Sequence, residues 1–195
     1  MEDAGLIRAL IETHPFATLV VTVNGRPDAI HVPVLLDADG KTLYGHMSRA
    51  SPQWRTFDGQ RESLVIFCGP DCYVSPVSYR TVPAVPTWNY LAVHVYGAPA
   101  LLDDDGLKRA LDRAVSRFDD AWPADRERDY PDDYRDRLSK QIVGFRMPVT
   151  RIQAQFKLSQ DKTPEDRARV IKTLESGSGE ERSVAAWMRR INDGN

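Results

Sequence analysis

The stretch ATLVVTVNGRPDAIHVPVLLDADGKTLYGHM, residues 17–47, decides which kind of fold this chain can adopt. It holds three runs rich in β-branched and apolar residues, which favour extended strands, at 17–23, 30–36 and 41–47. Asn24-Gly25 lies between the first two runs, and this pair accepts the positive φ angles of a tight hairpin turn. Pro33 has no N–H for a neighbouring strand, so we expect an edge or a bulge there. The segment predicts a meander of short antiparallel strands.

The rest of the chain continues this pattern and adds helices in blocks. Further strands are expected at 63–68, 72–76, 91–102 (with a bend at 97–99) and 144–160. Helices are expected at 3–13, at 103–118 and from Thr163 onward, whereas the charged segment 123–137 is typical of a solvated loop running into a helix. Strands and helices do not alternate, so the order indicates the α+β class with a small antiparallel barrel.

The composition disfavours some classes of function but does not identify one. The 195 residues carry a net charge of −2 and 28% charged side chains, which is not the basic balance of a nucleic-acid-binding surface. No run of 18 apolar residues is present, and the start MEDAGLIRALIETHP lacks the apolar centre of a signal peptide. Cys68 and Cys72 are therefore expected to be reduced thiols of a cytoplasmic protein. We expect one main domain at 1–175 and a helical tail at 176–195.

Several well-defined catalytic motifs are absent from the sequence. It contains no Walker A loop, no GxGxxG after a strand, no GxSxG and no HExxH. Phosphate-loop, dinucleotide-binding, serine hydrolase and zinc protease chemistry are thereby disfavoured.

With these motifs absent, the histidines are the first candidates for functional residues. His31, His46 and His94 lie in predicted strands, and His14 lies at the exit of the first helix. A neutral imidazole on a strand can ligate haem iron or hydrogen-bond a flavin ring. The alternative is that each is an ordinary structural residue.

Three short segments add polar side chains. In GHMSRASPQW (45–54), Arg49 with nearby serines suits an anionic group such as a phosphate or a propionate, although an ordinary loop with a surface arginine is the alternative. In FKLSQ (156–160), Lys157 and Gln160 alternate with apolar residues. In VPTWNYLAVH (85–94), Trp88 offers a flat face to a ring system.

These segments carry a family resemblance. GHMSRASPQW, GPDCYVSP, VPTWNYLAVHVYG, IVGF and FKLSQ resemble, in order and spacing, the PaiB family of FMN-binding split-barrel proteins, from about Leu6 to Leu174. The resemblance implies a split β-barrel with peripheral helices, related to pyridoxamine-phosphate oxidases and flavin reductases. It also implies a homodimer with cofactor sites between subunits.

The resemblance also assigns residues to the site. The strand that begins at His31 lines the cofactor ring. The anionic end of the cofactor lies near His46, Arg49, Ser51 and Gln53. The site is closed by Thr87, Trp88, Asn89 and His94, and a later strand adds Lys157, Ser159 and Gln160.

Two classes of function remain open within this family. Some members are FMN-binding negative transcriptional regulators, and a similar branch consists of haem-dependent piperazate synthases. DNA binding requires phosphate neutralisation, for which a net charge of −2 is poorly suited. We therefore expect an enzyme that uses haem b to close an N-hydroxylated diamino acid by forming an N–N bond. The alternative is an FMN-binding regulator, with DNA as its partner, or a flavin-dependent oxidoreductase.

The haem hypothesis gives each site residue a role. His31, or alternatively His46, ligates the iron, and Arg49 holds a propionate. The catalytic residues are expected to be His94, Lys157, Asn89 and Thr87. The other cofactor contacts are expected from Ser51, Gln53, Trp88, Ser159 and Gln160.

Overall fold

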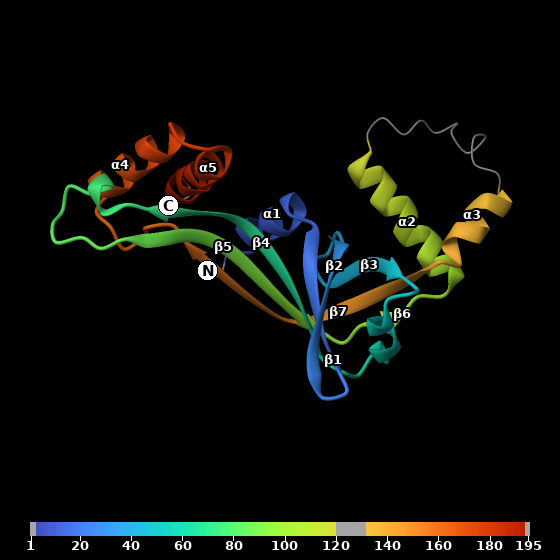
Figure 1. Ribbon diagram of the computed structural model, residues 1–195. Helices are drawn as coiled ribbons and strands as arrows, with labels where there is room; N and C mark the ends of the chain where they lie inside the picture. The colour runs from blue at the N-terminus through green and yellow to red at the C-terminus, as the bar shows by residue number, and fades with distance from the viewer. Residues whose placement is uncertain (1–2, 120–131, 194–195) are drawn as a thin grey trace. The chain divides into compact units, whose positions relative to one another are not determined.

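The computed structural model describes residues 3–119 and 132–193 (Figure 1). The chain divides into two compact units, which are described separately. The described residues of the barrel unit are 4–67, 94–119 and 132–152. Those of the α4–α5 unit are Asp3, 68–93 and 153–193.

A hairpin forms the first two strands of the barrel unit, as the sequence predicts. Strands β1 (Phe16–Val23) and β2 (Arg26–Leu36) pair antiparallel, ending at Val23↔Arg26. The turn uses φ angles of 50° at Asn24 and 75° at Gly25, both in the left-handed region that Asn and Gly tolerate. The Asn-Gly prediction is confirmed.

Pro33 lies where β2 changes its partner strand. The pairing with β1 ends at Phe16↔Pro33, and the pairing with β3 (Thr42–Ser48) begins at Val34↔Gly45. The missing N–H of proline is tolerated at such a changeover because neither ladder continues through it. The sequence predicts an edge or a bulge at Pro33, whereas the structure has a change of pairing partner there, from β1 to β3.

The remaining strands close the sheet. They are β4 (Ser63–Val74), β5 (Thr87–Gly97), β6 (Ala100–Leu101) and β7 (Ile142–Lys157). The strand order is β3-β2-β1-β4-β5-β7-β6, and an additional antiparallel pairing joins β3 to β7. This second pairing closes β1 to β5 and β7 into a barrel and leaves the two-residue strand β6 at its margin, paired with β7.

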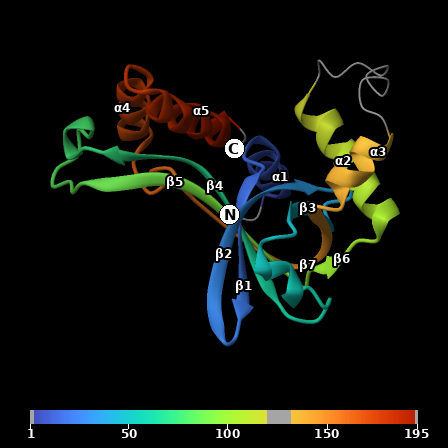
Figure 2. The same cartoon turned by 45° about the vertical axis from the view of Figure 1, so that its right-hand side comes forward.

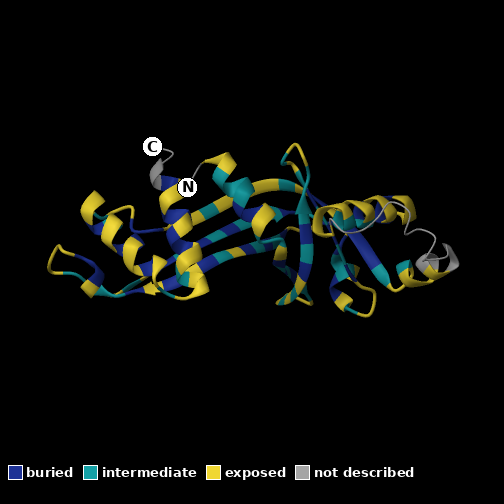
Figure 3. Cartoon of the chain, turned by 90° about the horizontal axis from the view of Figure 1, so that it is seen from above, coloured by how far each residue is buried: buried dark blue, intermediate teal, exposed yellow. Residues whose placement is uncertain are grey.

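Alternating apolar side chains fill the barrel, and Figure 3 shows the buried positions along the strands in dark blue. Leu43 and Met147 are cross-strand partners and both are buried. Gly45 leaves room for Phe145, because a Cβ at residue 45 would lie 2.6 Å from that ring. Phe57 meets the Phe145 ring edge-on at 5.2 Å. Each such side chain contributes about 1.5–3 kcal/mol on burial.

Helices surround the barrel. They are α1 (Ala4–Thr13), the 3-10 turn η1 (Pro52–Thr56), α2 (Asp104–Phe118) and α3 (Asp132–Ser139). Helix α2 starts at a capping residue, Asp103, whose carboxylate accepts the Gly106 N–H at 2.7 Å. Figure 2 shows α2 beside β3 and β6. Of the charged segment predicted at 123–137, residues 123–131 lie outside the described residues.

The α4–α5 unit packs two helices against strand segments (Figures 1 and 2). It contains the 3-10 turn η2 (Pro76–Ser78), α4 (Pro164–Glu175) and α5 (Gly179–Asp193). Thr163 caps α4 by accepting the Asp166 N–H at 3.2 Å, as its sequence predicts. Phe156 and Trp187 meet edge-on at 5.8 Å.

The predicted break between two strands at residues 69–71 is wrong, and the predicted domain boundary at residue 175 is not tested. The strands expected at 63–68 and 72–76 form one continuous strand, β4. The pairing of β4 with β1 runs from Leu64 to Ile66. Pro70 lies beyond this pairing, so its missing N–H does not remove a hydrogen bond between β4 and β1. The predicted boundary between residues 175 and 176 falls inside the α4–α5 unit, between its two helices. Among the described residues, no helix is long and apolar enough to cross a membrane.

Candidate cofactor site

The loop after β3 holds two positive charges beside one indole ring. The Arg49 guanidinium donates from Nε to the Lys140 carbonyl at 2.8 Å and from Nη2 to the Ile142 carbonyl at 3.0 Å. Trp54 donates its indole N–H to the Arg49 carbonyl at 2.9 Å. The guanidinium groups of Arg49 and Arg55 lie 5.9 and 5.2 Å from the Trp54 ring centre. The hydrogen bonds to backbone carbonyls and the cation–π contacts with the Trp54 ring fix the conformation of this loop, which carries two positive charges.

Gln53 in the same loop has an acceptor without a partner. Its side chain is 8% exposed, and its Nε2 donates to the Asp28 carboxylate at 3.2 Å. Its Oε1 is buried and finds no hydrogen-bond partner among the described residues. An unpaired buried acceptor costs about 1–3 kcal/mol, so Oε1 is a position at which a bound ligand or water would supply the missing donor.

Ser51 precedes the 3-10 turn and has a hydroxyl free of any capping bond to it. Its backbone N–H donates to the Ser48 carbonyl at 3.1 Å, which tightens the loop. Ser51 is half-buried, next to the buried Gln53. The two side chains therefore offer one acceptor and one hydroxyl from neighbouring positions.

These residues fit a flavin better than a haem. A flavin has an imide N–H and ribityl hydroxyl groups, which are donors for the Gln53 acceptor. The polar groups of haem are two propionates, which in their ionised form only accept. The guanidinium groups of Arg49 and Arg55 suit the phosphate of FMN, and equally a propionate. The unpaired Oε1 is thus the feature that separates the two cofactors.

His46 lies on β3 opposite Gly144 of β7 and is half-buried. Burial lowers its pKa, which keeps the imidazole neutral. The hollow beside it, shared with Tyr44 and Phe118, has a volume of about 10 Å³, roughly that of a single water probe. A macrocycle does not fit between His46 and α2 in this arrangement.

His31 is differently placed. It is exposed on β2, opposite Thr18, and stacks on Phe16 with 6.2 Å between ring centres and 25° between planes. Phe16 is itself 68% exposed, so the two rings form a flat, accessible surface. His94 lies on β5 between the buried residues Val93 and Val95, on the opposite face of the strand.

The other predicted site residues lie in the α4–α5 unit, where the structure brings some of them together. Lys157 Nζ donates to the Thr87 hydroxyl. Asn89 is 0% exposed, and its Nδ2 donates to Ser159 Oγ at 3.1 Å and to Met188 Sδ at 3.5 Å. Ser159 Oγ donates back to Asn89 Oδ1 at 3.2 Å. In this structure the Asn89 amide therefore joins β5 to α5 inside the core of the unit.

Gln160 and Trp88 complete this set. Gln160 accepts the Leu158 N–H at 2.7 Å and donates to the Phe156 carbonyl, so its amide closes the turn after β7. Trp88 is 53% exposed and meets Tyr73 edge-on at 6.1 Å. The cofactor roles predicted for both residues stay predictions.

Sequence reasoning missed two residues that support the loop at residues 49–55, called the cofactor loop below. Asp28 on β2 orients the Gln53 amide, and Trp54 within the loop orders the two arginines. The only signal for Asp28 is a carboxylate between two predicted strands, which does not reveal its partner 25 residues away. Trp54 stood within the quoted motif, but an indole in a loop does not by itself indicate which cations stack on it.

The closed antiparallel barrel with peripheral helices defines this chain as a split-barrel protein. Residues 1–151 match a family model described as "Putative FMN-binding domain". The chain is 36% identical over 176 residues to the Bacillus subtilis protein named Protease synthase and sporulation protein PAI 2, covering 85% of this chain and 81% of that protein. It therefore belongs to the PaiB family of FMN-binding-domain proteins. It is also 28% identical over 218 residues to the uncharacterized protein AN0679 of Emericella nidulans, covering 88% of this chain and 86% of that one.

Solved structures share the fold at lower sequence identity. The FAD and heme binding protein from Mycobacterium smegmatis matches with a TM-score of 0.64 and 20% identity, over 86% of this chain and 78% of that chain. The flavocytochrome Anf3 from Azotobacter vinelandii matches with a TM-score of 0.63 and 17% identity, over 86% and 74% of the two chains. The split-barrel fold class predicted from the sequence is confirmed.

Proposed function

We propose that this chain binds FMN through the barrel unit and uses it as a redox group. The observation that carries the proposal is the buried, unpaired Oε1 of Gln53, which requires a donor. The family model over residues 1–151 supports the same cofactor. Bound FMN supplies one- and two-electron transfer.

The residues of the cofactor loop have distinct tasks in this proposal. Gln53 accepts a hydrogen bond from the flavin, and Asp28 holds the amide in the orientation that makes this possible. Arg55 and Ser51 bind the phosphate. Arg49, which donates to two backbone carbonyls, positions the loop and adds positive charge.

The phosphate contact gives a direct test. FMN and riboflavin differ only in the phosphate, so the ratio of their dissociation constants isolates that contact. We expect FMN to bind at least about tenfold more tightly, since a charge-assisted hydrogen bond contributes about 1.5–3 kcal/mol. Arg55→Gln should lower this ratio. Arg190→Gln is the matched control, because Arg190 stacks on Trp187 at 5.1 Å in the other unit. An unchanged ratio in Arg55→Gln contradicts the assignment.

A second candidate function rests on the exposed pair of Phe16 and His31. In it, His31 ligates haem b and the chain is the N–N bond-forming enzyme expected from the sequence. The substrate's N–O bond breaks, an N–N bond forms and water leaves, so no external oxidant is needed. Of the residues that the sequence predicts to be catalytic, His94 lies in the same unit as His31 and would move protons.

The visible spectrum of the purified protein separates the two candidates. A Soret band that disappears in His31→Ala favours haem, whereas flavin bands that persist in this variant favour FMN. The homodimer implied by the family resemblance stays a prediction, which sedimentation with and without FMN will check. Retardation of DNA in a gel by a colourless protein would contradict both candidates and favour the regulator.

A further inference from the structure

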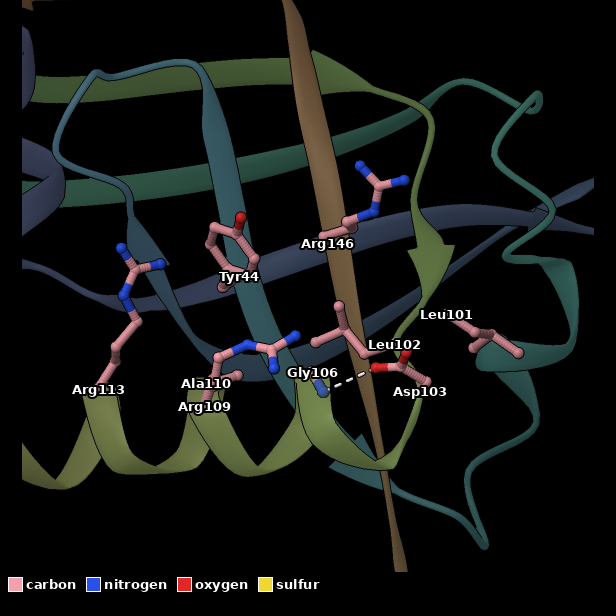
Figure 4. Close-up of a pocket in the computed structure, with 9 residues that line it drawn as sticks. All are labelled: Tyr44, Leu101, Leu102, Asp103, Gly106, Arg109, Ala110, Arg113 and Arg146. Atoms are coloured by element: carbon pink, nitrogen blue, oxygen red, sulfur yellow. Dashed lines mark hydrogen bonds between the residues drawn. The ribbon is translucent and has the colours of Figure 1, made fainter.

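Three arginines line a pocket beside α2. Arg109 and Arg113 are four residues apart on α2 and thus share one helix face. Arg146 on β7 is the cross-strand partner of Tyr44 on β3, which places these two side chains next to each other. All four line one pocket of about 480 Å³, and Figure 4 shows the arginines around Tyr44. The Arg113 guanidinium lies 5.1 Å from the Tyr44 ring centre.

The charges that line this pocket are strongly unbalanced. Asp103 is the one carboxylate among the described residues that line it, and its Oδ1 already accepts the Gly106 N–H at 2.7 Å. Asp105 and Asp112, on the same helix, do not line the pocket. Like charges four residues apart on a helix, such as Arg109 and Arg113, destabilise it, although Asp105, four residues before Arg109, offsets part of this repulsion. A bound anion would relieve the repulsion, in a chain whose net charge is −2.

We propose that this pocket binds a small organic phosphate ester at a site separate from the cofactor loop. Guanidinium forks match the oxygens of a phosphate and keep their charge at every physiological pH. The Tyr44 hydroxyl adds a donor. The volume exceeds that of a phosphate alone and falls within the range of small-molecule sites. Leu101 and Leu102 line the pocket and provide apolar surface for the organic part.

The site is distinct from the FMN site proposed above, since the two share no residue. The cofactor loop contributes residues 49–55, and the pocket is built by α2 and strand residues of β3, β6 and β7. FMN is itself a phosphate ester, however, so the experiment must separate the two sites.

Calorimetric titration of the full chain, saturated with FMN, by phenyl phosphate tests the proposal. We expect one phenyl phosphate per chain, with binding weakened at least about tenfold in Arg109→Gln and in Arg146→Gln. Arg151→Gln is the matched control, because Arg151 also lies over a tyrosine, Tyr96, in the same unit and outside the pocket. Thermal unfolding confirms that each variant is folded.

Three results would overturn the proposal. The first is the absence of saturable phenyl phosphate binding to the FMN-loaded chain. The second is equal binding of benzoate, which would show that the site does not select phosphate. The third is loss of FMN binding in Arg109→Gln and Arg146→Gln, which would make the pocket the phosphate end of the FMN site.

Discussion

The amide of Gln53 donates to the carboxylate of Asp28 at 3.2 Å, and this bond decides which end of the amide stays unpaired. A carboxylate only accepts, so the NH₂ group must face Asp28 and the carbonyl oxygen must face away. The buried Oε1 is therefore an acceptor held in a fixed direction. In the proposed site, FMN donates to this oxygen, so its binding depends on the bond between Gln53 and Asp28.

Gln53→Met should separate ligand binding from stability. The substitution removes the acceptor, so we expect FMN affinity to fall about tenfold, equivalent to about 1.4 kcal/mol. The free protein should lose less than about 1 kcal/mol, because the unpaired acceptor disappears together with the bond to Asp28. Fluorescence titration and urea unfolding measure the two effects. Gln141→Met, at an exposed position in the same unit, is the control. Unchanged FMN affinity in Gln53→Met contradicts the role of Oε1.

His46 should make the protein less stable in mild acid. Burial lowers its pKa in the folded chain below the value of 6.5 expected when unfolded. The unfolded chain therefore takes up a proton first as the pH falls through 6.5, and this uptake favours unfolding. Urea unfolding between about pH 7.5 and pH 5 should show a steeper loss of stability in the wild type than in His46→Gln. Parallel profiles of the two proteins would show that the imidazole is not desolvated.

The fold was largely predictable because its strongest signals are local. The Asn24-Gly25 turn, the α4 cap at Thr163 and the bend after Gly97 all follow from neighbouring residues. The continuous β4 strand was not predictable, since Gly69-Pro70 ordinarily marks a turn. Its conformation depends on where the partner strand β1 ends, which is a property of the barrel rather than of the local sequence.

Asp166 should hold the loop that precedes β5. Its Oδ1 accepts the backbone N–H of Arg80 at 2.6 Å, and hydrogen bonds from Thr81 and Arg80 lower the pKa of this buried carboxyl. Asp166→Ala should cost about 2 kcal/mol in the free energy of unfolding, and Asp166→Asn about half of that, because the amide keeps an acceptor.

Urea unfolding measures both substitutions of Asp166. The control is Asp161→Ala, which removes an exposed pair with Lys162 at 2.7 Å and should change stability by less than about 0.5 kcal/mol. If Asp166→Ala proves no less stable than this control, the anchoring role is refuted.

The two cysteines should differ sharply in reactivity. Burial, with Glu181 and Asp71 nearby, raises the pKa of the Cys72 thiol to about 11, while Cys68 is exposed. Only the thiolate reacts with iodoacetamide, so at about pH 8 the folded protein should be labelled at Cys68 and spared at Cys72. Mass spectrometry of the digested protein locates the label. Equal labelling of both residues before unfolding would contradict the burial of Cys72.

The candidate site was predictable in part. The sequence marked Arg49, Ser51 and Gln53 through one motif, and the structure gathers them in one loop. The sequence could not indicate that Asn89 and Ser159 are buried, at 0% and 4% exposure, and hydrogen-bonded to each other. A buried and an exposed asparagine look alike in a sequence. The arginine pocket could not be predicted from the sequence either, because Arg146 lies opposite Tyr44 only through the pairing of β3 with β7.

Binding of FMN by the barrel unit can be measured by titrating the ligand-free chain with FMN and following the quenching of flavin fluorescence. We expect a saturable curve that ends at one FMN per chain. A fluorescence that rises in proportion to added FMN, with no break, would contradict it.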